Sequence, residues 1–175
     1  MASPLRVNAA ELLRRAGTEK RVDLRVALDE LGIEGDERFA PEAEAAVRLR
    51  LESLTDGIVV DGTIAVEWHG VCRRCLADTG GITHSEVRDL YQRVLTDPDA
   101  FELQGDLLDL APVVREVVLL DSPSTPLCRP DCAGLCPTCG TNLNEGSCDC
   151  APPPADPRWA GLAGLTVLND DLPPE

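Results

Sequence analysis

The chain has 175 residues and carries a formal net charge of −15 at pH 7, from 31 acidic and 16 basic side chains. This length predicts one domain with, at most, a small appendage, and no apolar run approaches the roughly 18 residues of a membrane span. The acidic balance argues against a protein that coats nucleic acid through long-range attraction. With only five aromatic residues, the core is expected to consist of Leu, Val, Ile and Ala.

The N-terminal part combines a short helical pattern with two extended ones. Asn8 is expected to cap a helix over residues 9–15 that ends at Gly17. Apolar and polar residues alternate over residues 22–28 and again over residues 47–52. This alternation predicts two strands, each with one buried face.

A third apolar stretch covers residues 58–68 and is interrupted by Asp61-Gly62. An Asp-Gly pair between apolar runs favours a tight hairpin turn, with a bulge inside one long strand as the alternative. An extended pattern resumes over residues 82–91. Cys72 and Cys75 are therefore expected on a turn between antiparallel strands.

The next segment, residues 97–109, holds five acidic and no basic side chains, which predicts a solvated loop and nothing more. The spacing of Leu110, Val114, Val117 and Val118 is helical. We expect that helix to end near residue 120, where serines and prolines follow.

The chain is expected to end in a proline-rich spacer and a short helix. Asp156-Pro157 has the form of a cap followed by proline at the first helical position. Trp159, Leu162 and Leu165 would share one face of that helix. We expect this face to dock on the domain itself.

Eight cysteines carry most of the functional information. Cys136 and Cys139 form a C-x-x-C pair with a glycine after it, as in a zinc knuckle, and Cys148 and Cys150 follow after a turn-rich segment. These four make a compact set. The two remaining pairs are Cys72 with Cys75 and Cys128 with Cys132. They can close a second four-thiolate site that ties the middle of the chain to its end.

We interpret the two sets as structural Zn²⁺ sites, two ions per chain. Disulfides are the first alternative, but no secretory signal is visible, which indicates a reducing cytoplasm. Redox catalysis by Cys72 and Cys75 would require a strand-to-helix turn that the pattern does not show. An iron–sulfur cluster also suits four thiolates and remains an alternative. His69 could substitute as a ligand, but it is more typical of a partly exposed strand residue.

No catalytic residues are identified. The chain lacks a Ser-His-Asp order, a glycine-rich phosphate loop and a histidine-rich metal set. A zinc ion held by four thiolates has no open coordination position. We therefore expect a protein that is not an enzyme and has neither a small-molecule substrate nor a membrane partner.

The predicted fold class is α+β. An antiparallel sheet, either a meander or barrel-like, would carry few helices and a zinc-binding cysteine-rich C-terminal segment. We divide the chain into an α+β domain (1–127) with the Cys72/Cys75 hairpin, a zinc-binding segment (128–150), and the spacer with the short C-terminal helix (151–175).

Four motifs, in this order, resemble the bacterial YceD family of large ribosomal RNA subunit accumulation proteins. They are V-C-R-R-C-L at 71–76, V-V-L-L-D-S-P at 117–123, C-x3-C-x-G-L-C-P-x-C-G-x-N-L-N at 128–144, and D-P-R-W-A-x-L-x-x-L at 156–165. The third and the closing D-P-R-W are specific, and the resemblance covers nearly the whole chain.

The resemblance implies a cytoplasmic ribosome biogenesis factor that promotes accumulation or processing of large-subunit ribosomal RNA. Its partners would be the large-subunit ribosomal RNA precursor, a basic ribosomal protein, or both. The basic N-terminal segment (1–25), Arg73 and Arg74 are the contact candidates, and solvated arginines are the simpler interpretation. A zinc-stapled adaptor without a ribosomal role and a thiol redox or iron–sulfur protein are the alternative functions.

Overall fold

The computed structural model describes residues 4–151 and 156–164. Seven strands, one α-helix (α1) and three short 3-10 helices (η1–η3) make up this part of the chain. In chain order they are β1 (Arg6–Asn8), η1 (Leu12–Arg14), β2 (Glu19–Ala27), η2 (Leu28–Leu31), β3 (Glu44–Ser53), β4 (Gly57–Val71), β5 (Asp78–Gln92), β6 (Phe101–Glu102), β7 (Leu107–Asp109), α1 (Ala111–Asp121) and η3 (Pro157–Gly164). No helix within this part is long and apolar enough to cross a bilayer.

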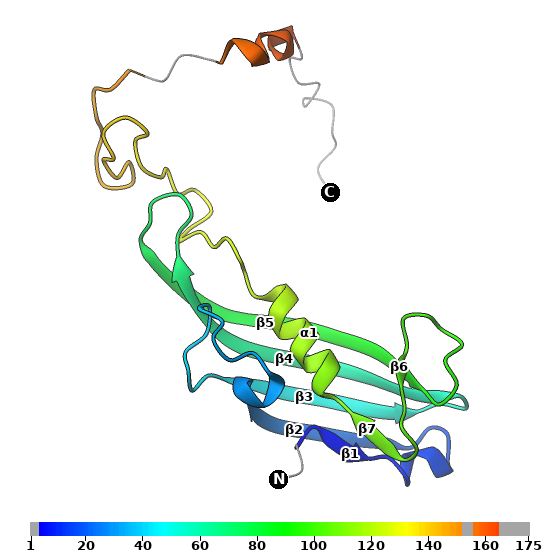
Figure 1. Ribbon diagram of the computed structural model, residues 1–175. Helices are drawn as coiled ribbons and strands as arrows, with labels where there is room; N and C mark the ends of the chain where they lie inside the picture. The colour runs from blue at the N-terminus through cyan, green and yellow to red at the C-terminus, as the bar shows by residue number, and fades with distance from the viewer. Residues whose placement is uncertain (1–3, 152–155, 165–175) are drawn as a thin grey trace.

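The main sheet has five strands in the order β2-β3-β4-β5-β6 (Figure 1). Strands β2 to β5 form an antiparallel meander, and the short β6 adds in parallel to the end of β5. A separate antiparallel ladder joins β1 to β7. The predicted α+β class is thus confirmed, and the sheet is an open meander with β2 and β6 at its two edges.

One face of the sheet carries the core. Helix α1 lies across this face over β4 and β5 (Figure 1), and the predicted helix is confirmed. The strands alternate between side chains buried on this face and half-buried or exposed side chains on the open face. The largest buried side chains include Leu51, Ile58, Ile64, Tyr91, Leu110 and Val114. As the composition predicted, this core is mainly aliphatic.

Strand β4 runs without a break through Asp61-Gly62, so the predicted hairpin turn at this pair is wrong. The register of β4 against β3 is continuous from Val59 to Val66, which also excludes a bulge. Gly62 has a φ of +150°, and a Cβ there would lie 2.1 Å from the carbonyl oxygen of Arg48. Glycine is therefore needed at this position because the backbone of β3 approaches it closely, not because the chain turns there.

The acidic segment 97–109 is more than the solvated loop that its charge predicted. It contributes β6 and β7, and Leu103 and Leu108 are buried. The buried Gln92 side chain orders its start by accepting hydrogen bonds from the N–H groups of Thr96 (3.1 Å) and Asp97 (3.2 Å). The apolar residues among the acids were the overlooked signal, because Leu103 and Leu108 belong to the core cluster.

Both terminal helices are shorter or tighter than predicted. Asn8 does accept a hydrogen bond from the N–H of Ala10 (2.9 Å), but only the 3-10 turn η1 follows. At the other end Asp156 caps η3 by accepting from the N–H of Arg158 (2.9 Å). Trp159 is 63% exposed, so its expected docking on the domain is wrong. The side chains of Leu162 and Leu165 lie outside the described residues.

Arg38 sets the point at which the chain leaves α1. Its guanidinium donates to the carbonyl oxygens of Leu119 (3.1 Å) and Ser122 (2.7 Å), which are otherwise unsatisfied at a helix C-terminus. Asp36 holds the same guanidinium at 2.8 Å, and this hydrogen bond lowers the pKa of Asp36. Arg38 thus holds the end of α1, from which the chain continues to the tip of the β4–β5 hairpin (Figure 1).

We predict that Gly62→Ala destabilises the chain by about 2–3 kcal/mol, because the new methyl group would overlap the backbone of β3. The midpoint of urea unfolding measures this loss. Gly146→Ala is the control, since no atom lies within 4 Å of the Cβ position there. Equal midpoints for the two variants would contradict the close approach.

Candidate metal centres

Strands β4 and β5 extend past β3 as a two-stranded arm. Pairing of β4 with β3 stops at Val66, whereas pairing with β5 continues to Val71 and Asp78 (Figure 1). The turn at its tip contains Cys72 and Cys75, as the sequence predicted. The N–H of Cys72 donates to Ala77 (2.8 Å), which closes the turn.

The cysteine-rich segment 128–150, which we name the tail, packs together with the residues just before it against this tip through backbone contacts. The N–H of Arg73 donates to the carbonyl oxygen of Pro126 (3.0 Å), and that of Leu135 donates to the carbonyl oxygen of Arg74 (3.1 Å). The Arg74 guanidinium donates in turn to the carbonyl oxygen of Cys132 (2.9 Å). Gly134 permits the approach, because a Cβ there would lie 3.1 Å from the Arg74 carbonyl oxygen.

This packing brings four sulfurs together, which we name the hairpin tetrad: Cys72, Cys75, Cys128 and Cys132. The Sγ atoms of Cys72 and Cys132 are 3.8 Å apart, and those of Cys75 and Cys128 are 3.6 Å apart. No pair of sulfurs in the set is separated by more than 4.8 Å. All but Cys128 are buried.

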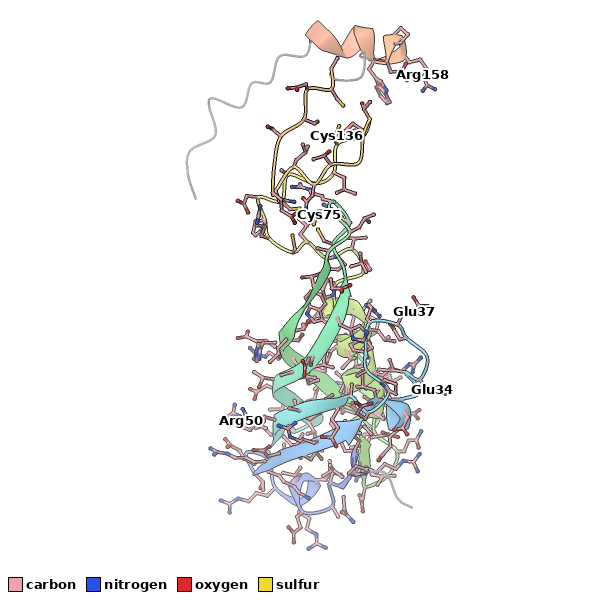
Figure 2. All side chains as sticks on the ribbon, turned by 90° about the vertical axis from the view of Figure 1, so that its left-hand side faces the viewer. Glu34, Glu37, Arg50, Cys75, Cys136 and Arg158 are labelled. Atoms are coloured by element: carbon pink, nitrogen blue, oxygen red, sulfur yellow. The ribbon has the colours of Figure 1, made fainter. Side chains whose placement is uncertain are left out.

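A second set, which we name the tail tetrad, joins Cys136, Cys139, Cys148 and Cys150 within the same 4.8 Å limit. Figure 2 labels one member of each tetrad, Cys75 and Cys136, at the end of the molecule away from the sheet. The tail tetrad is the more exposed of the two, with only Cys136 buried.

The two C-x-x-C turns have the same backbone geometry. In each, the residue after the second cysteine donates its N–H to the carbonyl oxygen of the first: Leu76 to Cys72 and Gly140 to Cys136, both at 2.9 Å. That residue has a positive φ, 59° for Leu76 and 75° for Gly140. The sequence indicated this for Gly140 but not for Leu76, an exposed leucine in a conformation that costs an L-residue about 1–2 kcal/mol.

Hydrogen-bond donors lower the pKa at two positions of each tetrad, Cys72 and Cys132 in one and Cys136 and Cys139 in the other. The N–H groups of Cys128 and Cys75 lower the pKa of Cys72 to about 6. The hydroxyl and N–H of Thr141 lower the pKa of Cys139 to about 6, and its hydroxyl lies 3.2 Å from the Cys139 sulfur. A thiolate is the form of cysteine that binds metal ions.

One other thiol of each tetrad, Cys128 and Cys150, favours the protonated form when no cation is bound. Partial desolvation of its sulfur, followed by hydrogen bonds with the neighbouring thiols, raises the pKa of Cys128 to about 12 although the residue as a whole is exposed. The hydrogen bond with Cys139 raises the pKa of Cys150 to about 12. Four negative sulfurs within 4.8 Å repel one another. A divalent ion at the centre would attract all four sulfurs and favour the deprotonated form of each coordinating thiol.

The spacing fits one tetrahedral ion. A Zn–S bond of about 2.3 Å places the sulfurs of a regular tetrahedron about 3.8 Å apart. The Sγ distances of 3.6 and 3.8 Å in the hairpin tetrad agree with this value. They are too long for disulfide bonds, and all eight cysteines are free.

The structure therefore groups the eight predicted site residues in the two predicted sets, while their role as zinc ligands stays a prediction. His69 is exposed on the open face of β4 and belongs to neither tetrad. Cys72 and Cys75 lie at a β-hairpin tip, not at the strand-to-helix turn of a thioredoxin-like site. The division into parts 1–127, 128–150 and 151–175 also stays a prediction.

Sequence reasoning missed two polar residues beside the sulfurs, Thr141 and Asn144. The Asn144 side-chain amide donates to the Cys132 sulfur at 3.4 Å. The sequence predicts only a turn-rich segment between Cys139 and Cys148, and Asn144 lies in it. The signal that could have identified it is its place in the cysteine motif, four residues before Cys148.

Fold and site together define a class: a β-meander protein whose longest hairpin presents two four-cysteine clusters. The chain belongs to the YceD family, described as "Large ribosomal RNA subunit accumulation protein YceD", with residues 60–166 matched. The matched part begins within β4 and includes all eight cysteines.

Relatives of this chain support the same family. It is 34% identical over 186 residues to "Uncharacterized protein Rv2926c" of Mycobacterium tuberculosis, which covers 98% of this chain and 86% of that protein. A shorter match joins it to "Large ribosomal RNA subunit accumulation protein YCED homolog 1, chloroplastic" of Arabidopsis thaliana, with 34% identity over 58 residues, 33% of this chain and 18% of that protein. No solved structure matches the chain.

We predict that Gly140→Ala weakens metal binding at the tail tetrad about tenfold, because its φ of 75° disfavours any L-residue. Competition with a chelator measures the change. Gly146→Ala lies in the same loop without a positive φ and should leave the affinity unchanged. Equal affinities for both variants would show that the turn geometry does not limit binding.

Proposed function

We propose that this chain is a ribosome biogenesis factor, which promotes accumulation or processing of large-subunit ribosomal RNA in the cytoplasm. The observation that carries the proposal is the family match over residues 60–166. A plant relative from Zea mays, 41% identical over 46 residues, is also named as a large ribosomal RNA subunit accumulation protein. That match covers 26% of this chain and 16% of the relative.

In this proposal the chain binds two structural Zn²⁺ ions, one in each tetrad. The ion of the hairpin tetrad would hold the tail against the β4–β5 arm. The ion of the tail tetrad would stabilise the loop structure between Cys136 and Cys150. The sulfur spacing supports a single ion in each set, because thiolates bound to different irons of a cluster would lie farther apart. A mononuclear iron would fit the same geometry, but it would be coloured.

The factor would act without catalysis. Four sulfurs fill the coordination sphere of a tetrahedral zinc ion, which leaves no position for a water molecule or substrate. The ions would serve stability, since binding free energy at such sites is also folding free energy. This assignment is consistent with the absence of a recognisable catalytic motif in the sequence.

The charge favours a basic ribosomal protein as the direct partner over bare RNA. Segment 29–44 carries seven acidic residues against a single arginine, Arg38, which is already paired with Asp36. Glu34 and Glu37 of this segment project from the body of the molecule (Figure 2). An acidic surface attracts a basic protein and repels phosphate, so the chain would protect or deliver such a protein before it meets its RNA.

The first prediction concerns metal content. The purified chain should contain two zinc ions, and the Cys75→Ser and Cys139→Ser variants should each retain one, because the two residues belong to different tetrads. Elemental analysis measures the zinc, and a colourless visible spectrum excludes iron. Absence of bound metal in the unaltered chain would refute the structural zinc sites.

The second prediction concerns the ribosome. In a strain that lacks the gene, we expect a lower ratio of large-subunit to small-subunit ribosomal RNA, restored by the unaltered gene. On a sucrose gradient the chain should sediment with large-subunit precursors. A normal RNA ratio together with only free protein on the gradient would contradict the proposed function.

A nuclease control separates the two partners. Capture of a basic ribosomal protein from a lysate should survive digestion of RNA if the protein is the direct partner. Replacement of Glu34 and Glu37 by Gln should then weaken capture, whereas replacement of Asp97 and Asp99, acids of another loop, should not. Loss of the captured protein on nuclease treatment would instead identify RNA as the contact.

A further inference from the structure

The loop between two ligands of the tail tetrad also contacts the hairpin tetrad. This loop, residues 140–147, joins Cys139 to Cys148. From within it, the side-chain amide of Asn144 donates to the Sγ atom of Cys132 at 3.4 Å. Cys132 is buried and belongs to the other tetrad. The Asn144 side chain therefore connects the loop of the tail tetrad with a sulfur of the hairpin tetrad.

The orientation of the Asn144 amide is fixed by its surroundings. Its Oδ1 atom accepts from the N–H of Ala133 (2.8 Å) and from the guanidinium of Arg129 (2.7 Å). Both partners are obligate donors, so the oxygen must face them and the nitrogen must face Cys132. Asn142 accepts from the same nitrogen at 2.8 Å and completes its contacts.

The backbone holds the loop in the same place. The N–H of Leu143 donates to the carbonyl oxygen of Gly134 at 2.9 Å, and Asn142 forms a β-bridge with Leu135. Gly134 and Leu135 belong to the segment that connects the two tetrads along the chain. Asn144 thus lies over Cys132 on a loop whose two ends join directly to ligands of the tail tetrad, Cys139 and Cys148.

Thr141, in the same loop, provides the matching contact for the tail tetrad. Its hydroxyl lies 3.2 Å from the Sγ atom of Cys139. The loop thus carries two donors, three residues apart, which point to sulfurs of different tetrads. A hydrogen bond to a thiolate stabilises the charged form and orients the sulfur toward its ion.

We propose that Asn144 is a positioning residue that couples the two tetrads, so that metal binding in the tail tetrad strengthens metal binding in the hairpin tetrad. The inference rests on the proposed metal binding. Closure of the loop around the tail ion places the Asn144 amide on the Cys132 sulfur before the hairpin ion arrives. The coupling is reciprocal, because each ion must change the affinity for the other by the same factor.

The test uses the full chain loaded with ¹¹³Cd²⁺, which replaces zinc at thiolate sites and gives a separate NMR resonance for each ion. Cys75→Ser and Cys139→Ser assign the two resonances, because each removes a ligand of one tetrad. Asn144→Asp keeps an oxygen for Ala133 and Arg129 but loses the N–H donor to Cys132. It should shift the hairpin resonance and lower metal affinity there about 10-fold to 100-fold.

Thr141→Val is the matched control from the same loop. It removes the hydroxyl beside Cys139 and should shift only the tail resonance. Chelator competition should also show that the hairpin ion is released more readily from the Cys139→Ser variant, whose tail tetrad is open, than from the unaltered chain.

The outcomes separate the two proposals. Two resonances that do not respond selectively to Asn144→Asp would overturn the coupling and leave metal binding intact. Equal release of the hairpin ion from the unaltered chain and from Cys139→Ser would also overturn it, since the tail ion would then have no effect on the hairpin tetrad. Failure of the unaltered chain to bind cadmium would refute the metal sites themselves.

Discussion

The structure depends on the convergence of four thiols from two distant segments at the tip of one hairpin. Cys72 and Cys75 are held by a closed turn, whereas Cys128 and Cys132 arrive from beyond α1. Sulfurs this close repel one another when ionised, so their grouping requires either protons or a cation. A divalent ion would add a strong link between the sheet and the tail to the few hydrogen bonds and the packing of Leu127 and Leu135 against the buried cysteines.

This constraint explains the shape of the hairpin. Past Val66 the arm of β4 and β5 has no strand beside it on the β3 side, and a two-stranded ribbon alone is marginally stable. The tail lies on its tip, and Arg74 contributes one side-chain contact there to Cys132. The sheet thus presents the cysteine-rich tail, together with η3, at one end of the molecule (Figure 1).

Much of this arrangement could be predicted. The alternation of β2 and β3, the hairpin tip and α1 followed from patterns within a few residues, and the hairpin tetrad followed from the two cysteine pairs that the compact tail set left over. The errors fell where a distant segment decides the outcome. Gly62 lies against the backbone of Arg48, and Leu108 lies in the core. Asn144, in the loop of the tail tetrad, donates to Cys132 of the hairpin tetrad. Residue type at those positions does not reveal the partner.

By itself, the sequence determined the local elements and the two cysteine sets, because C-x-x-C spacing and apolar periodicity depend on neighbouring residues. The tertiary structure alone shows that β4 is continuous, that segment 97–109 adds two short strands, and that the loop 140–147 contacts both tetrads. These features require atoms far apart in the chain to approach within a few ångströms. Such approach is set by packing of the whole sheet and tail, which no local pattern encodes.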